Sequence, residues 1–218
     1  MARTLIAITG GIGAGKSVVS EILRVSGCYV YDCDDNAKRL MDSDARIKSR
    51  IINDIDPRAI NADGSINRPL LSDIVFADKD KLATLNHIVH SAVFEDIAAQ
   101  KRQCSDKILF VESAILYTSG LWRQVDEIWE VTADIETRVA RVMRRNNLPR
   151  EQVLRRIHSQ SGEQRPSDCT LRVYTITNDD TTALLPQVWS ALSERVGYRA
   201  PTGTKPLSGV IYGRTSPI

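Results

Sequence analysis

One segment near the N-terminus combines glycines, a lysine and a hydroxyl at the spacing that binds a polyphosphate. Leu5–Ile8 has the apolar pattern of a buried strand, Gly10–Ser17 reads G-x-x-x-x-G-K-S, and Val18–Arg24 continues as a helix with an apolar face. Glycines let backbone N–H groups approach phosphate oxygens, and the helix directs the positive end of its dipole at the same anion. Lys16 is placed to reach the β- and γ-phosphates of a nucleoside triphosphate, and the Ser17 hydroxyl to bind Mg²⁺. A glycine-rich turn without a ligand is the alternative, but it does not require this order of strand, loop and helix.

The second expected strand, Cys28–Tyr31, is followed by three carboxylates, those of Asp32, Asp34 and Asp35. In an open α/β sheet, ligands bind beyond the carboxyl ends of the strands, so these acids lie beside the phosphate loop. Asp32 and Asp34 are two residues apart and share a face if the backbone is extended. A carboxylate that faces a substrate hydroxyl can accept its proton during phosphoryl transfer, and one that faces Mg²⁺ can hold a metal-bound water. The alternative is that Asp34 or Asp35 caps a helix over residues 36–41.

A third candidate acid, Glu112, ends the apolar run Lys107–Glu112, which predicts a central strand. In nucleotide-binding folds a carboxylate at this place orients Mg²⁺ or its bound waters. Two further strands are expected. Polar and apolar residues alternate over Asp126–Ala133, which places this strand nearer an edge of the sheet or gives it one polar face. The last strand, Val173–Asn178, precedes a closing helix over residues 181–195.

Residues 43–103 predict a mostly helical insertion, with helices over 45–53 and 79–103 and turn-forming residues over 63–69. His87 and His90 lie three residues apart on the longer helix. Zinc-binding pairs on a helix are normally four residues apart, and no third ligand is in register. We therefore expect histidines at the surface or in contact with substrate rather than a metal site.

A basic helical hairpin covers Glu136–Arg145 and Arg150–Gln160. Arg138, Arg141 and Arg145 fall at i, i+3 and i+7, on one helix face. A run of charges is usually a solvated face, and this holds for some of these residues. The Asn-Asn-Leu-Pro break makes the hairpin a plausible hinged flap, which could bring arginines to a triphosphate and exclude water.

Composition limits the remaining possibilities. The net charge of +2 is close to balance, which argues against nucleic acid as a partner, and no stretch has the length of a transmembrane helix. The four cysteines form no C-x-x-C pair, which is typical of reduced thiols in the cytoplasm. Residues 199–218 are polar and interrupted by proline and glycine, so we expect a loosely packed tail.

Several motifs together resemble the dephospho-CoA kinase family in order and spacing. They are Gly10–Ser17, Tyr31–Asp34, Ile74–Phe76, Leu85–His90 and Arg156–Gln160. The resemblance runs from about Thr4 to Leu192. It implies an α/β P-loop kinase fold of three layers, with a five-stranded parallel sheet, a helical acceptor-binding insertion and an arginine-rich lid. The implied reaction uses ATP and Mg²⁺ to phosphorylate the ribose 3′-hydroxyl of 3′-dephospho-CoA, the last step of coenzyme A synthesis.

The resemblance also implies a division of the chain. Residues 1–198 form one kinase unit, with a core over 1–34, 104–143 and 166–198, an insertion over 35–103 and a lid over 144–165. A monomer or weak homo-oligomer that acts on a small molecule is expected.

Combining the residues with the resemblance gives a specific expected site. The catalytic residues are Asp34 as base, Lys16, and the lid arginines Arg141 and Arg145. Acceptor contacts are expected at Asp32, Asp34, Arg68 and His90, and metal contacts at Ser17, Asp32 and Glu112. ATP contacts are expected at Gly11, Ile12, Gly13, Ala14, Gly15, Lys16, Ser17, Val18 and Asn178.

The chain departs from the family pattern at a few positions. Val18 stands where the family usually has threonine, Ser91 where it has proline, and Thr118 where it has an acid. Another small-molecule or nucleoside monophosphate kinase of the same fold is the nearest alternative. A GTPase is disfavoured because residues 177–180 lack the lysine of a guanine-reading Asn-Lys-x-Asp motif.

Overall fold

The computed structural model describes residues 3–196, and the expected tail over 199–218 lies outside them. The strands are β1 (Thr4–Thr9), β2 (Val30–Asp32), β3 (Ile108–Glu112), β4 (Glu127–Thr132) and β5 (Val173–Thr177). The α-helices are α1 (Lys16–Val25), α2 (Cys33–Ser43), α3 (Ala45–Asp54), α4 (Arg68–Ala77), α5 (Lys79–Gln103), α6 (Ile135–Asn146), α7 (Arg150–Ser159) and α8 (Leu184–Val196). Short 3₁₀ helices are η1 (Pro57–Ala59), η2 (Leu121–Gln124) and η3 (Gln160–Gly162).

All five predicted strands are present and form one parallel sheet in the order β2-β3-β1-β4-β5. β1 occupies the middle, and β3 is an interior strand beside it. β4 lies between β1 and β5, near the β5 edge of the sheet, as its alternating polar and apolar residues predict. The connection from β1 leads to β2 on one side, and the connection from β3 leads to β4 on the other side of β1, so a crevice opens at the carboxyl end of β1, where ligands bind in such sheets.

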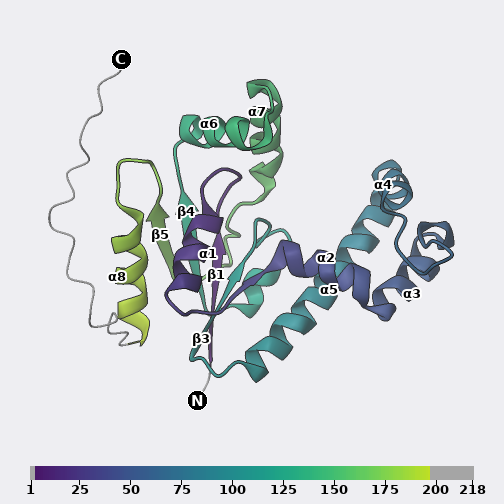
Figure 1. The fold of residues 1–218 in the computed structure, drawn as a ribbon, viewed down its shortest axis with the longest axis horizontal. Coiled ribbons are helices and arrows are strands. Elements are labelled where there is room, and N and C mark those ends of the chain that lie inside the picture. Colours follow the sequence, from purple (N-terminus) through teal and green to yellow (C-terminus); the bar gives the residue numbers. More distant parts are fainter. Residues whose placement is uncertain (1–2, 197–218) are drawn as a thin grey trace.

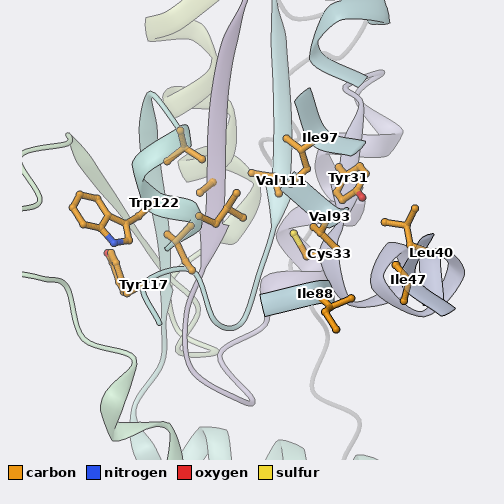
Figure 2. Close-up of a cluster of buried hydrophobic side chains, with 14 of the residues drawn as sticks. Tyr31, Cys33, Leu40, Ile47, Ile88, Val93, Ile97, Val111, Tyr117 and Trp122 are labelled. Carbon is orange, nitrogen blue, oxygen red and sulfur yellow. The ribbon is translucent and has the colours of Figure 1, made fainter. Parts of the chain in front are cut away.

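Successive β1 side chains point to opposite faces of the sheet and create two cores. Ile6 and Ile8 pack with buried residues of α1 and α8. Leu5 and Ala7 belong to the other core, which includes buried residues of α5. Figure 1 shows α1 and α8 beside the sheet, and Figure 2 shows Ile97 of α5 close to Val111 of β3. The result is a three-layer α/β fold, as the resemblance implies.

The segment between β2 and β3 is helical, as predicted, and extends away from the sheet along α2 and α5 (Figure 1). α4 was not expected: its first turn begins inside the predicted turn over residues 63–69, because Asn67 caps it by accepting from Leu70 N at 3.2 Å. Buried Leu40 of α2 and Ile47 of α3 lie near each other at the outer end of the same core (Figure 2).

The basic hairpin also forms as predicted. α6 and α7 meet at Asn147, which adopts a left-handed conformation and ends α6. Val139, Val142, Val153 and Ile157 form a separate small core, and Ile12 of the phosphate loop packs against it. The hairpin therefore lies over the carboxyl ends of the strands and contacts the phosphate loop directly (Figure 1). No helix within residues 3–196 is both long and apolar enough to cross a membrane.

A buried ion pair joins β4 to α8. Arg195 Nε lies 2.6 Å from Glu127 Oε1, and the two side chains are 9% and 10% exposed. Glu127 also accepts from Trp129 Nε1 at 2.8 Å, and the Arg195 guanidinium lies 5.9 Å from the centre of the Trp129 ring. The alternating pattern suggested a polar face on this strand, but Glu127 is buried because Arg195 and Trp129 satisfy its carboxylate.

We predict that Arg195→Ala lowers the free energy of unfolding by about 3 kcal/mol or more, because it leaves the Glu127 carboxylate buried without its partner. The control is Arg172→Ala, which removes an exposed ion pair with Glu194 (62% and 45% exposed). That variant should change the free energy of unfolding by no more than about 1 kcal/mol. Urea unfolding followed by circular dichroism measures both. Equal losses in the two variants would contradict a special role for the buried pair.

Candidate active site

A cavity of about 660 Å³ opens at the carboxyl ends of β1 and β3, beneath the α6–α7 hairpin. Its lining combines the phosphate loop, two carboxylates and three arginines of α6, Arg141, Arg144 and Arg145. The lining residues are Ile12, Gly13, Gly15, Lys16, Ser17, Val18, Asp34, Glu112, Ala114, Arg141, Val142, Arg144, Arg145 and Gln160. The structure thus brings together the predicted loop, the predicted base Asp34, the acid Glu112 and both predicted lid arginines.

The phosphate loop places Lys16 at the first residue of α1, with its amino group folded back onto the loop. Lys16 Nζ donates to Gly10 O at 3.0 Å. Burial lowers the pKa of Lys16, while the nearby carboxylates of Glu112 and Asp34 oppose that shift. A bound polyphosphate would add negative charge beside this amino group and favour its charged form.

Gly15 could not be another residue without moving its surroundings. Its φ is +98°, in the left-handed region, and a Cβ built there would lie 2.0 Å from Asn178 Nδ2. Asn178 follows β5 and donates from this same Nδ2 to Ala14 O at 2.8 Å. Asn178, which was predicted to contact ATP, therefore helps to hold the shape of the phosphate loop. Its contact with the nucleotide itself stays a prediction.

The acids after β2 differ from the expected arrangement. α2 begins at Cys33, so the backbone from Asp32 to Asp34 is not extended and the two carboxylates do not share a face as a strand would require. Asp32 is the N-cap, since its Oδ1 accepts from Asp35 N at 3.0 Å. The alternative interpretation, in which Asp34 or Asp35 caps the helix, is wrong. Asp34 lies in the first helical turn and lines the cavity, whereas Asp32 is not among the lining residues.

Glu112 is the acid that best fits a cation. Burial raises the pKa of Glu112, while the neighbouring Ser20 hydroxyl and the Lys16 charge act in the opposite direction. The buried Oε2 makes no hydrogen bond of regular geometry among residues 3–196. No group of three or more His, Cys, Asp or Glu side chains in that part of the chain could enclose a metal ion. Mg²⁺ does not need such a cage, because it commonly binds one or two protein oxygens with phosphate and water as its other ligands. Ser17 and Glu112, which both line the cavity, fit that role.

The arginines of α6 divide into different tasks. Arg141 NH1 donates to Asn178 O at 2.9 Å, and its NH2 pairs with Asp180, so this predicted lid arginine is held by the loop after β5. Arg145 lines the cavity and donates from Nε to the neighbouring Asn146 Oδ1 at 3.0 Å. Arg138 donates from Nε to Ile12 O at 2.9 Å and so supports the loop backbone. Arg144, which sequence reasoning did not single out, also lines the cavity.

Two residues after α7 matter more than the sequence suggested. Gln160 Oε1 accepts from Ile12 N at 2.7 Å, across 148 residues of chain. The Glu163 carboxylate accepts from the backbone N–H of Tyr117 and from the Thr118 hydroxyl, the latter at 2.6 Å. These contacts join the phosphate loop and the loop after β3 to one segment. Gln160 stood in a recognised motif, which was the available signal, but nothing local indicated Glu163.

The two remaining acceptor candidates lie elsewhere. His90 lines a neighbouring pocket that Asp34 also lines. Arg68 begins α4, and its NH2 lies 2.6 Å from Asp42 Oδ1. It is not among the lining residues of the main cavity, so its expected contact with the acceptor stays a prediction.

Comparison with known proteins agrees with this geometry. The dephospho-CoA kinase family model matches residues 4–183. The dephospho-CoA kinase of Bacteroides fragilis is 37% identical over 185 residues, which cover 84% of this chain and 88% of the relative. The crystal structure of TT1252 from Thermus thermophilus superposes with a TM-score of 0.70 at 30% identity, covering 89% of this chain and 96% of that one. The dephospho-CoA kinase from Campylobacter jejuni has a similar fold, with a TM-score of 0.62 at 22% identity over 87% and 96% of the two chains.

The close approach at Gly15 predicts a selective defect. Gly15→Ala should weaken ATP binding at least about tenfold, because its Cβ displaces Asn178 and with it the loop. Gly27→Ala is the matched control. Gly27 has a φ of +84°, and a Cβ there meets nothing within 4 Å, so it introduces backbone strain without a clash. Calorimetric titration with ATP compares the two; similar affinities for both variants would contradict the assigned role of this contact.

Proposed function

Because the chain belongs to the dephospho-CoA kinase family, we propose that it transfers the γ-phosphoryl group of ATP to the ribose 3′-hydroxyl of 3′-dephospho-CoA. The products are CoA and ADP. The observation that carries this proposal is that Lys16, Asp34 and Arg145 line one cavity. Phosphoryl transfer needs groups that bind the donor phosphates, accept the acceptor's proton and stabilise the charge in transit, and these three residues have those chemistries.

The phosphate loop binds the donor. Backbone N–H groups over residues 13–17 and the Lys16 ammonium surround the β- and γ-phosphates, at the N-terminus of α1. When bound, Mg²⁺ offsets the charge of the phosphate oxygens, and Ser17 and Glu112 are the residues that would hold it. Asn178 and Arg141, which contact each other, support the nucleotide side of the loop.

Asp34 acts as the base on the acceptor side. Its carboxylate lines the same cavity as Lys16 but comes from the start of α2, on a different strand connection. A hydroxyl between the two would face the carboxylate on one side and the γ-phosphate on the other, which is the order that transfer requires. A positioned base contributes roughly 10²–10⁴-fold to the rate, and an arginine on the transferring group roughly 10³–10⁵-fold. Arg145 is thus expected to matter at least as much as Asp34.

The division into a core, an acceptor-binding insertion over 35–103 and a lid over 144–165 is part of this proposal. So is a cytoplasmic location, which the four free cysteines support because thiols stay reduced there. A monomer or weak homo-oligomer is sufficient, because one chain supplies the loop, the base and the arginines.

The acceptor can be tested directly with an assay that couples ADP release to a colour change. We expect dephospho-CoA to be phosphorylated with a kcat/KM at least about a hundredfold above AMP, shikimate or gluconate, because a pocket with specific polar contacts rejects molecules that leave those contacts unmade. A preference for one of the other acceptors would contradict the proposed substrate, although the protein would still be a kinase.

The base has a matched control in the next residue. Asp34→Asn should lower kcat at least about tenfold and leave ATP affinity nearly unchanged, because the amide keeps the shape but accepts no proton. Asp35→Asn should keep normal turnover: Asp35 is exposed, and its carboxylate lies 3.0 Å from Lys38 Nζ. Steady-state kinetics of both variants measures kcat and the KM for ATP. Normal turnover of Asp34→Asn would rule out the base assignment.

A further inference from the structure

The carboxylate of Glu163 joins two segments that lie far apart in the chain. Its Oε1 accepts from the backbone N–H of Tyr117, and its Oε2 accepts from Thr118 N at 3.2 Å and from the Thr118 hydroxyl at 2.6 Å. Hydrogen bonds to an ionised carboxylate are roughly twice as strong as those between neutral groups. Three of them on one side chain therefore fix the position of Glu163 relative to the loop after β3.

The loop after β3 is a firm attachment point. Leu116 and Tyr117 are both buried in the larger core, and Figure 2 shows Tyr117 among its side chains. The loop begins after Glu112, and Glu112 and Ala114 both line the main cavity. Glu163 is therefore tied to a well-packed part of the protein that also forms a wall of the site.

On its other side, Glu163 holds the end of the basic hairpin. It directly follows η3, which continues from α7. Val153 and Ile157 of α7 pack against Val139 and Val142 of α6 in the small core of the hairpin. Because close-packed interiors transmit strain, a displacement at the end of α7 also moves α6.

Arg145 is the cavity residue that such a movement affects most. It lies in the last turn of α6, at the tip of the hairpin and away from both of its connections to the sheet. With a rise of about 1.5 Å per residue, Arg145 is about 15 Å along the axis from the start of α6, so a tilt of about 4° moves it by about 1 Å. The contact of Glu163 at the base of the hairpin therefore controls a position at its tip.

We propose that Glu163 is a positioning residue for phosphoryl transfer, which acts by holding Arg145 over the cavity. The inference rests on the proposed function, in which Arg145 stabilises the charge on the transferring group. Glu163 is not among the lining residues of the main cavity, so it acts through the hairpin rather than by touching a substrate. The hydroxyl of Thr118 is part of this contact, since an acid at 118, as in the family pattern, would face Glu163 as a like charge.

The test compares single-turnover rate constants, measured with labelled ATP and saturating enzyme and dephospho-CoA. Under these conditions the rate constant does not depend on how much of a variant is folded. Glu163→Gln keeps the shape of the side chain but replaces one accepting oxygen by an NH₂ group, which only donates. We expect it to lower the rate constant at least about tenfold, because a misplacement of about 1 Å can cost roughly 10²-fold. The matched control is Glu151→Gln, an exposed position on α7, which should change the rate constant by less than about twofold.

The same substitution in Arg145→Ala separates positioning from a structural role. If Glu163 acts through Arg145, then Glu163→Gln should lower the rate constant of Arg145→Ala by no more than about twofold, because the effects of residues that act as a unit do not add. Thr118→Val removes the hydroxyl donor and probes the same contact from the other side. Its loss of rate should likewise depend on the presence of Arg145.

An equal loss with and without Arg145 would assign Glu163 a purely structural role and overturn the inference. A normal rate constant in Glu163→Gln would overturn it too. No turnover of dephospho-CoA by wild type would instead refute the proposed function, and a normal rate constant in Arg145→Ala would refute the role given to that arginine. Either of these two results would remove the basis of the inference.

Discussion

The structure depends on one constraint: a short glycine loop must keep its backbone N–H groups free to surround an anion. Glycine permits many backbone conformations, and within the loop Ala14 N donates to Gly11 O at 3.1 Å and Lys16 Nζ to Gly10 O at 3.0 Å. Side chains of distant segments add further hydrogen bonds to the same backbone. Arg138 and Gln160 bind the two backbone groups of Ile12, and Asn178 binds Ala14 O. The sheet, the hairpin and the strand β5 therefore all contribute to a single loop.

The same arrangement explains where the remaining chemistry lies. Parallel strands bring the ends of β1, β2 and β3 to one edge of the sheet, with Ile8, Asp32 and Glu112 in adjacent register. α2 starts immediately after β2, because Asp32 caps it, and this start places Asp34 toward the loop. Asp32 therefore helps to position the proposed base Asp34, although it does not line the cavity itself.

Local patterns in the sequence were sufficient for the phosphate loop, all five strands and the helical hairpin, because each depends on residues within one short segment. Three features could not be predicted this way. Asp32, rather than Asp34 or Asp35, is the cap because α2 begins at Cys33, three residues before the expected helix over 36–41. Glu127 is buried because Arg195, far along the chain, neutralises it. Arg141 contacts the loop after β5 rather than standing alone on a flap, and this contact depends on how α6 packs in three dimensions.

The central claim is that one cavity holds the donor phosphates and the acceptor hydroxyl in line, between Lys16 and Asp34. A crystal structure with a non-hydrolysable ATP analogue and dephospho-CoA tests it most directly. The account predicts phosphates on the loop over residues 13–17 and an Asp34 carboxylate oxygen within about 2.6–3.2 Å of the ribose 3′-oxygen. A ribose bound away from Asp34, with another group beside its 3′-hydroxyl, would contradict the account.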